Sequence, residues 1–168
     1  NYRTTLTWYQ DLDLCKQVDN RDSAYDLDLL KRMYKYLSRH GDLFYIKYKN
    51  RLCGDVCLQP GGAVNIVIAK PFQNKHIGRR VMKEIIQVAK EKEISELHAE
   101  IYTFNTQSQK MFQSIGFTQV DNEDMYLVCK FQFVSVGIGR SVMTMASFEL
   151  DNIADSLFIR VRFMLNQV

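Results

Sequence analysis

The chain has 168 residues, of which 46% are hydrophobic and 24% charged, and its formal net charge is +3. This length and composition suit one globular domain with a sizeable core, with room for at most an appendage. The small net charge gives no support for nucleic-acid binding. No apolar run approaches the roughly 18 residues of a membrane-spanning helix, so we predict no membrane partner.

The four cysteines, Cys15, Cys53, Cys57 and Cys129, do not have the pattern of a metal site. Cys53 and Cys57 share one apolar run, but no second cysteine pair or histidine pair completes a zinc ligand set. We therefore predict reduced core thiols and no metal. The N-terminus has no basic region followed by an apolar stretch, so we expect no signal peptide and a cytoplasmic protein.

The predicted elements of the first half begin with an aromatic-rich run that favours a strand. In chain order they are a strand at 2–9, a loop or short helix at 11–20, an amphipathic helix at 25–37 stopped by His40-Gly41-Asp42, a hairpin of 43–48 and 52–58 through Lys49-Asn50-Arg51, and a turn at Pro60-Gly61-Gly62.

The second half begins with a nearly continuous apolar run at 63–69, which is typical of a strand covered on both faces. It continues with an amphipathic helix from Ile77, an alternating strand at 97–104, a helix capped by Asn105 or Thr106 and closed by Gly116, and strands at 117–120 and 125–133. Helices lie among strands throughout, so the predicted fold class is α/β in the layered α+β sense.

The segment Gln73–Arg80 joins the apolar strand to its helix and favours anion binding. A helix N-terminus offers unpaired N–H groups and a positive dipole end, and Gly78 lets the backbone approach a phosphate closely. Lys75, Arg79 and Arg80 add positive charge. A Walker A loop and a three-glycine dinucleotide loop are both missing. The alternative is an ordinary solvated helix start.

Two motifs resemble those of the GNAT superfamily of N-acetyltransferases. The first, Arg/Gln-x-x-Gly-x-Gly/Ala, is matched by Gln73 and Gly78, with His76 in place of the first glycine. The second is matched by residues that occur in family order at family spacing: Asn105, Ser108, Phe112 and the pair Gly116-Phe117. The resemblance covers roughly residues 1–133.

This resemblance implies a mostly antiparallel, twisted mixed sheet with flanking helices, in which two central parallel strands, 63–69 and 97–104, splay apart. It implies acetyl-CoA as cofactor, with the pantetheine arm in the splay. The cofactor-binding residues it implies are Ile68, Gln73, Asn74, Lys75, His76, Ile77, Gly78, Arg79, Asn105 and Ser108. Asn105 could instead be only a helix cap, or could do both.

Glu100 is the predicted catalytic residue, because attack on a thioester needs a neutral amine and therefore a base or a water relay. Glu100 lies five residues before Asn105, and in this the chain resembles ribosomal-protein alanine acetyltransferases, which have their catalytic Glu at the same offset. The alternative is that Glu100 is an exposed strand residue without a role. Many family members have a tyrosine as general acid where this chain has Phe112. Tyr102 could substitute for this tyrosine. The thiol of coenzyme A has a pKa of ~8.5, as for cysteine, so its thiolate can leave without strict acid catalysis.

The acceptor is predicted to be a small cationic amine or a peptide N-terminus. Residues 11–28 hold six aspartates against Lys16 and Arg21, in the region where the family builds its acceptor site. The candidates are Asp19, Asp22 and Asp26, with Trp8, Tyr9 and Tyr25. A solvated acidic surface is the alternative. A catalytically weakened acyl-CoA-binding sensor, suggested by Phe112, is the alternative function, and a structural domain without either property is the third.

We expect two parts in the chain: a GNAT-like domain at 1–133 and a C-terminal extension at 134–168. Gly137–Met143 echoes Ile77–Met82, but no second motif follows it, so we interpret the echo as chance. Alternation at 157–165 predicts a final strand that extends the sheet or forms a homodimer contact.

Overall fold

The computed structural model describes residues 1–133 and the backbone of residues 162–163. Three helices come first: α1 (Tyr2–Trp8), α2 (Leu12–Asp19) and α3 (Leu27–His40). They are followed by β1 (Asp42–Tyr48), β2 (Arg51–Leu58), β3 (Val64–Ile68), the short 3-10 helix η1 (Lys70–Phe72), α4 (Ile77–Glu91), β4 (Glu96–Tyr102), α5 (Thr106–Gln113), β5 (Thr118–Asn122), β6 (Tyr126–Gln132) and β7 (Arg162–Phe163).

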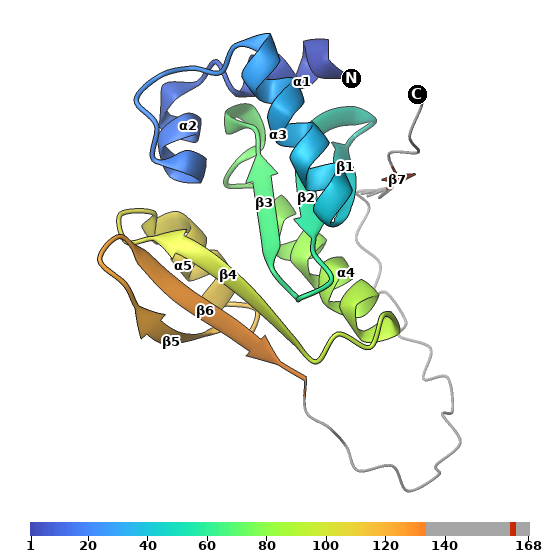
Figure 1. Ribbon diagram of the computed structural model, residues 1–168, viewed down its shortest axis with the longest axis vertical. Coiled ribbons are helices and arrows are strands. Elements are labelled where there is room, and N and C mark those ends of the chain that lie inside the picture. Colours follow the sequence, from blue (N-terminus) through green and yellow to red (C-terminus); the bar gives the residue numbers. More distant parts are fainter. Residues whose placement is uncertain (134–161, 164–168) are drawn as a thin grey trace, which may run out of the picture.

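The strands form two sheets that meet at one point. β3, β2 and β1 pair antiparallel in that order with β7 beside β1, and β4, β6 and β5 form the second sheet. A parallel bridge between Ala63 and His98 joins them, and the His98 N–H donates to the Gly62 carbonyl at 2.9 Å. Beyond the bridge β3 and β4 diverge (Figure 1). The predicted α/β class and pair of splayed parallel strands are confirmed.

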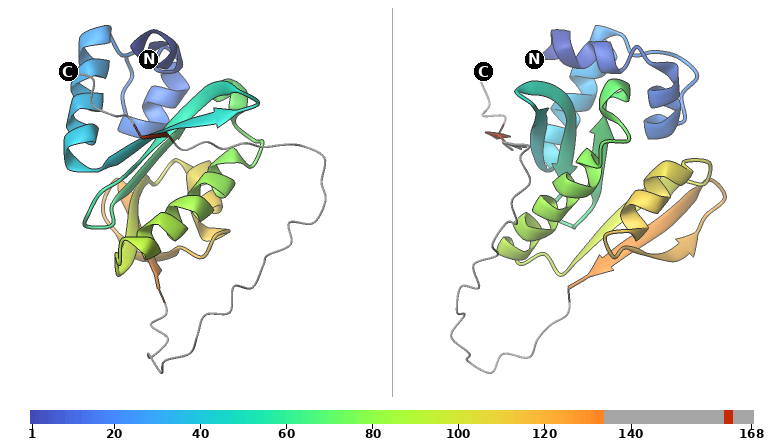
Figure 2. Two further views of the ribbon diagram at one scale, coloured as in Figure 1. Left: turned by 90° about the vertical axis from the view of Figure 1, so that its right-hand side faces the viewer. Right: turned by 180° about the vertical axis from the view of Figure 1, so that it is seen from behind.

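Helices cover both faces of the β1–β3 sheet, with α3 on one face and α4 on the other (Figures 1 and 2). One apolar core lies under α4, where Val81, Ile85 and Ala89 recur at intervals of one helical turn and are fully buried. The second core lies under the N-terminal helices and includes Leu30 and Tyr34 of α3. Burying a large apolar side chain contributes about 1.5–3 kcal/mol, so these two cores hold the sheet between its helices.

The predicted first strand is wrong, because residues 2–8 form helix α1. The side chain of Asn1 accepts a hydrogen bond from the N–H of Thr4 at 3.3 Å and caps the helix. Thr5 and Trp8, three residues apart, are both buried on one face. This cap and burial outweigh the preference of aromatic and β-branched residues for strands.

The remaining elements up to residue 133 follow the predicted order, with boundaries shifted by a few residues. Residues 12–19, where a loop or short helix was expected, are helical, and α5 begins after the capping residue Asn105. In β7, Phe163 pairs with Phe44 and Arg162 with Tyr45. The rest of the predicted tail, including Gly137–Met143, lies outside the described residues. Within the described part of the chain, no helix is long and apolar enough to cross a membrane.

Candidate active site

The segment between β3 and α4 has a backbone suited to binding an anion. Asn74 and His76 have left-handed φ angles of 59° and 58°, which cost a non-glycine residue about 1 kcal/mol. α4 begins at Ile77 without a side-chain cap and without an acidic residue in its first turn. Its first N–H groups are therefore available to a ligand at the positive end of a 15-residue helix.

A cavity of about 460 Å³ lies against this helix start, and α2, β3 and α5 contribute to its walls. Nine of the ten residues predicted for cofactor binding line it: Ile68, Gln73, Asn74, His76, Ile77, Gly78, Arg79, Asn105 and Ser108. The tenth, Lys75, is not part of the lining. Its Nζ donates to the Pro71 carbonyl at 2.8 Å and lies 5.4 Å from the centre of the Phe72 ring.

Gly78 and Arg79 lie in the wall of this cavity, in the first turn of α4. A Cβ built on Gly78 would lie 3.8 Å from Cγ1 of Ile68 and 3.9 Å from Cγ of Met111, so a side chain here would project into the cavity without a clash. The Nε atom of Arg79 is buried and has no hydrogen-bond partner among the described residues. Buried donors are nearly always paired, so an anion in the cavity would supply the missing acceptor.

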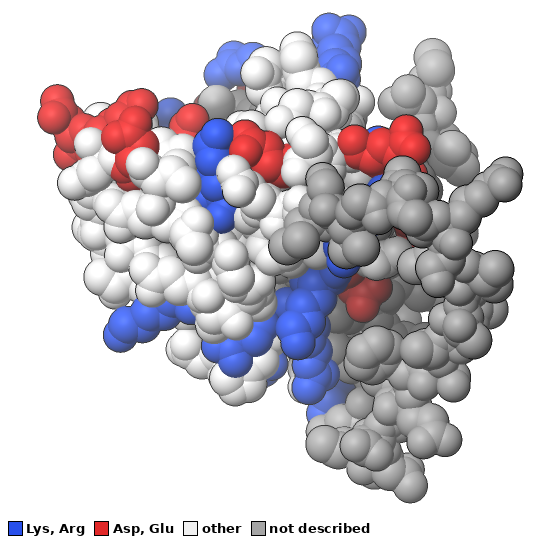
Figure 3. All heavy atoms as spheres, turned by 90° about the horizontal axis from the view of Figure 1, so that it is seen from below, with Lys and Arg blue, Asp and Glu red and all other residues white. Residues whose placement is uncertain are grey.

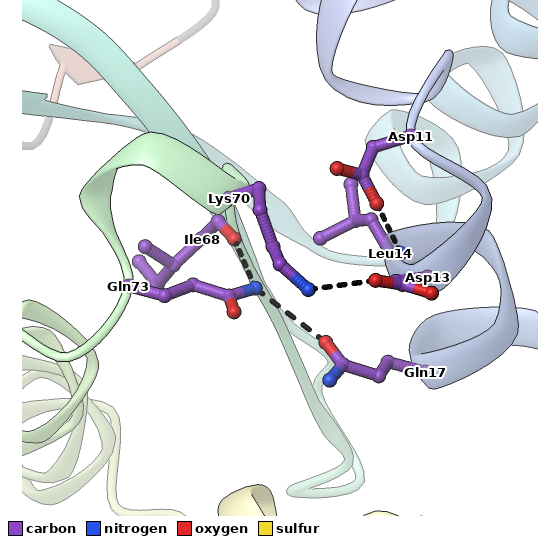
Figure 4. A network of polar contacts seen from close by, with 7 residues as sticks. All are labelled: Asp11, Asp13, Leu14, Gln17, Ile68, Lys70 and Gln73. Atoms are coloured by element: carbon purple, nitrogen blue, oxygen red, sulfur yellow. Dashed lines mark hydrogen bonds and ion pairs between the residues drawn. The ribbon is translucent and has the colours of Figure 1, made fainter.

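Polar contacts tie α2 to the wall of the cavity, as Figure 4 shows. Nε2 of Gln73 donates to the Ile68 carbonyl at 3.0 Å and to Oε1 of Gln17, on α2, at 3.5 Å. Lys70 forms an ion pair with Asp13, also on α2, at 3.0 Å. The Gln73 side chain therefore holds the loop and the Ile68 carbonyl in place, in addition to lining the cavity.

The edge of β3 that faces the splay presents backbone polar groups to the same cavity. On the other edge, the Ala69 N–H donates to the Cys53 carbonyl at 2.8 Å and the Ala63 carbonyl accepts from Gln59 at 2.9 Å. Because alternate residues of an antiparallel strand face the partner strand, Ile66 directs its backbone groups into the splay, as Ile68 does. An extended ligand arm could pair with them as a further strand would.

A second cavity, of about 310 Å³, adjoins the first. The two share a wall made by α2, β3 and the start of α5, formed by Gln17, Val18, Ile66, Val67, Asn105 and Ser108. The Oδ1 atom of Asn105 accepts from the Ser108 N–H at 3.1 Å and its Nδ2 donates to the Gln17 carbonyl at 3.2 Å. Asn105 is thus the helix cap considered from the sequence, and it also fixes α2 at the junction of the cavities.

Glu100 lies on β4, has an exposed side chain and lines the second cavity only. Phe112 is buried in the wall of that cavity. Burial, together with the neighbouring Tyr126 hydroxyl and the negative charges of Asp19 and Glu100, raises the pKa of Tyr102 to about 12. Tyr102 therefore keeps its proton at neutral pH and is a weak acid, so it is a poor substitute for the tyrosine that Phe112 replaces.

The acidic residues predicted for acceptor binding have different environments. Asp19 lines the second cavity, and burial raises its pKa while the nearby Arg21 opposes the shift. Asp22 pairs with Lys16 at 3.0 Å, and Asp26 caps α3. Neither of these two lines a cavity described here.

Among the three aromatic residues predicted beside them, Tyr9 lines the second cavity. Trp8 and Tyr25 are buried in the core under the N-terminal helices. On the face shown in Figure 3, acidic side chains lie in a band across the upper part of the view, and basic side chains lie both above and below this band.

Sequence reasoning missed Asp55. It lies on β2 opposite Val67, is only 3% exposed, and lines the second cavity. The Tyr34 hydroxyl donates to its Oδ2 at 2.6 Å. Burial raises the pKa of Asp55 to about 7, against the lowering effect of the Tyr34 hydrogen bond. The signal that could have found it is a lone carboxylate inside the apolar run 52–58.

All four cysteines are buried free thiols, as expected. The residues that the structure describes contain no cluster of three or more His, Cys, Asp or Glu side chains able to hold a metal ion.

A helix start with free N–H groups, at the opening between two splayed parallel strands, is the arrangement that the family resemblance implied. The family model described as "Acetyltransferase (GNAT) family" matches residues 5–117. The chain belongs to this family of acetyltransferases. A search of curated proteins finds no match.

Several solved structures share the fold at low sequence identity. A ribosomal-protein-alanine N-acetyltransferase from Brucella melitensis has a TM-score of 0.63 at 17% identity, over 79% of this chain and 94% of its own. A GNAT family acetyltransferase from Elizabethkingia anophelis with acetyl-CoA bound has a TM-score of 0.56 at 22% identity, over 72% and 89%. The PaiA N-acetyltransferase from Thermoplasma acidophilum in complex with coenzyme A has a TM-score of 0.61 at 15% identity, over 79% and 92%.

Proposed function

We propose that the chain is an acetyl-CoA-dependent N-acetyltransferase that moves the acetyl group to a primary amine by direct attack in a ternary complex. The observation that carries this proposal is the pair of adjoining cavities. One has a helix N-terminus and the unpaired Nε of Arg79, and the other has Glu100. Membership of the acetyltransferase family and the bound acetyl-CoA or coenzyme A in solved relatives support the assignment.

The first cavity suits coenzyme A. The start of α4, with Gly78 and Arg79, would hold the phosphates, and the backbone of Ile66 and Ile68 would hold the pantetheine arm in the splay. When bound, acetyl-CoA supplies an acetyl group activated as a thioester. A backbone N–H of β3 directed into the splay would polarise the thioester carbonyl.

The second cavity suits the acceptor. An alkyl ammonium has a pKa near ~10.4, so Glu100 would take a proton from the incoming amine, directly or through water. The neutral nitrogen would form a bond to the carbonyl carbon, and the carbon–sulfur bond would break with its electron pair on sulfur. The nitrogen, which carries a positive charge after the attack, would lose its second proton to solvent or to the departing thiolate, leaving a neutral amide. Because such a thiol has a pKa near ~8.5, the leaving thiolate needs no tyrosine at position 112. The buried free cysteines support the expected cytoplasmic location.

A Glu100→Gln variant tests the role of the base. We expect its kcat for thiol release from acetyl-CoA, measured with a panel of polyamines, aminoglycosides and peptides, to fall by about 10²–10⁴. Calorimetry should show unchanged affinity for acetyl-CoA, since Glu100 lines only the second cavity. Glu84→Gln, at an exposed site on α4, is the control and should keep full activity. Undiminished turnover by Glu100→Gln would remove Glu100 from this role.

The alternative function is a catalytically weakened acyl-CoA-binding sensor. It is favoured by Phe112, which is buried at the family's tyrosine position and cannot donate a proton. Tight acetyl-CoA binding without turnover on any amine of the panel would support this alternative. Absence of acetyl-CoA binding would contradict both functions and leave a structural domain.

A further inference from the structure

The second cavity is lined by acidic groups without basic ones. Asp19, Asp55 and Glu100 contribute carboxyl groups from α2, β2 and β4. Among the described residues that line it there is no lysine, arginine or histidine. If Glu100 serves as the base for the attacking nitrogen, the other two carboxyl groups have no part in the chemistry proposed above.

Asp55 is the unusual member of this set, because it is almost fully buried. One carboxyl oxygen accepts the 2.6 Å hydrogen bond from Tyr34, on α3. Tyr34 is the one hydrogen-bond donor to this carboxyl group within residues 1–133, and neither carboxyl oxygen is a fully buried atom without a hydrogen-bond partner. The Asp55 carboxyl thus has one fixed partner and an open side in a site large enough for a small ligand.

No positive charge in the described structure balances Asp55. The titratable groups whose pKa it raises are Tyr9, which follows α1, Tyr34 on α3, Tyr45 on β1 and Cys57 on β2. All four are neutral at pH 7, and no ion pair within residues 1–133 includes Asp55. A buried carboxylate is stabilised only when a cation or several donors accompany it. A cation from the ligand would complete the site.

We propose that the Asp55–Tyr34 pair is an ammonium-binding subsite that selects acceptors carrying a second positive charge, as in an α,ω-diamine. One nitrogen of the diamine reacts at the shared wall of the two cavities while the other, still protonated, binds Asp55. Asp55 lies opposite Val67, which belongs to that shared wall, so the subsite is one strand away from it. This specificity role rests on the proposed transferase function.

The test compares 1,6-diaminohexane with 1-aminohexane, which has the same carbon chain and one nitrogen. The variants are Asp55→Asn, which keeps an oxygen for the Tyr34 hydrogen bond, and Asp121→Asn, a surface control on β5 outside both cavities. In Asp55→Asn we expect KM for the diamine to rise at least about tenfold, with kcat and the KM for the monoamine within about twofold of wild type.

Direct binding separates this proposal from the transferase function. By calorimetry at about pH 8, Asp55→Asn should bind 1,6-diaminohexane at least about tenfold more weakly than wild type and Asp121→Asn. If no amine is acetylated, the proposed transferase fails, yet this Asp55-dependent binding would still support the subsite. Equal diamine affinity in wild type and Asp55→Asn would overturn the subsite even in an active enzyme.

A pH series distinguishes charge recognition from a purely structural role. The pKa of Asp55 is raised to about 7 by burial, so wild-type affinity for the diamine should increase as pH rises from about 6 to about 8. The diamine stays doubly protonated over this range. Asp55→Asn should show no such increase. The same pH dependence in both proteins would contradict the role of Asp55.

Discussion

At the scale of single residues, His76 and Gly78 of the segment Gln73–Arg80 stand at two positions where the family pattern has a small residue for different reasons. His76 stands where the family pattern has glycine, and its φ of 58° explains that preference, since glycine adopts this conformation without strain. Gly78 has an ordinary backbone, so its small size is needed for a different reason. A side chain there would occupy the space beside Ile68 and Met111 that the ligand requires.

Gly78→Ala should therefore weaken acetyl-CoA binding without lowering the stability of the fold. We expect its affinity for acetyl-CoA, measured by calorimetry, to fall about tenfold or more. Its free energy of unfolding should be unchanged or higher by up to about 1 kcal/mol, because alanine favours a helix over glycine. Unchanged affinity in this variant would show that the backbone at position 78 does not approach the cofactor closely.

Asp55 should make the stability of the ligand-free protein depend on pH. Its pKa is about 7 in the folded chain and about 3.9 when unfolded, so between these values the unfolded state binds fewer protons. The free energy of unfolding should therefore fall as pH rises from about 4 to about 7, by up to a few kcal/mol. In denaturant unfolding, Asp55→Asn should not show this decrease in the free energy of unfolding. Parallel curves of unfolding free energy against pH for wild type and Asp55→Asn would contradict the prediction.

The two halves of the site differ in how far the sequence predicts them. Most of the residues predicted for the first cavity follow from two local motifs, because a helix start and a helix cap are built from neighbours in the chain. The lining residues Leu14, Gln17 and Val18 of α2 were not predicted, since they are distant in the chain from both motifs. Asp55 and Tyr34 are 21 residues apart, and their contact depends on how α3 packs on β2. No local pattern encodes that packing, so the sequence does not single out Asp55.

At the scale of elements, the junction of β3 and β4 controls the opening of the site. Gly62 has a φ of 89°, and a Cβ at this position would overlap the Glu96 carbonyl oxygen at the start of β4. The hydrogen bond from His98 to the Gly62 carbonyl lies at the same point. Close backbone contact here sets the position from which the two strands diverge.

Alanine substitutions at the neighbouring glycines test this junction. Gly62→Ala should lower the free energy of unfolding by about 2 kcal/mol or more, because it combines backbone strain with the overlap at Glu96. Gly61→Ala is the matched control, since a Cβ at position 61 has no heavy atom within 4 Å. It should change stability by less than about 0.5 kcal/mol in thermal and denaturant unfolding. Similar losses in both variants would show that the junction is not constrained at Gly62.

Elements with a strong periodic pattern were predicted correctly, as α4 and the β1–β2 hairpin show. Helix α1 was not, because its short run of threonines and aromatic residues carries a strand preference that the Asn1 cap and burial against α3 override. The pair of splayed parallel strands was expected from the family resemblance alone. Apart from the β1–β2 hairpin, the sequence pattern does not fix which strands are neighbours.

At the scale of the whole molecule, the fold places two cavities on either side of one wall. The cofactor side has a helix N-terminus and an unpaired arginine donor, and the acceptor side has carboxyl groups without basic residues among its described lining. Each site therefore suits a ligand of opposite charge to the other. Their shared wall, held by Asn105 and Gln17, is where the two ligands would meet.

The central claim is that acetyl transfer to an amine takes place at this wall. The most direct measurement is mass spectrometry of 1,6-diaminohexane after incubation with acetyl-CoA and the protein, with coenzyme A thiol followed in the same samples. The account predicts a singly acetylated diamine and an equal amount of free thiol, both strongly reduced with Glu100→Gln. Tight acetyl-CoA binding without any acetylated amine, across the diamine and the wider acceptor panel, would contradict it.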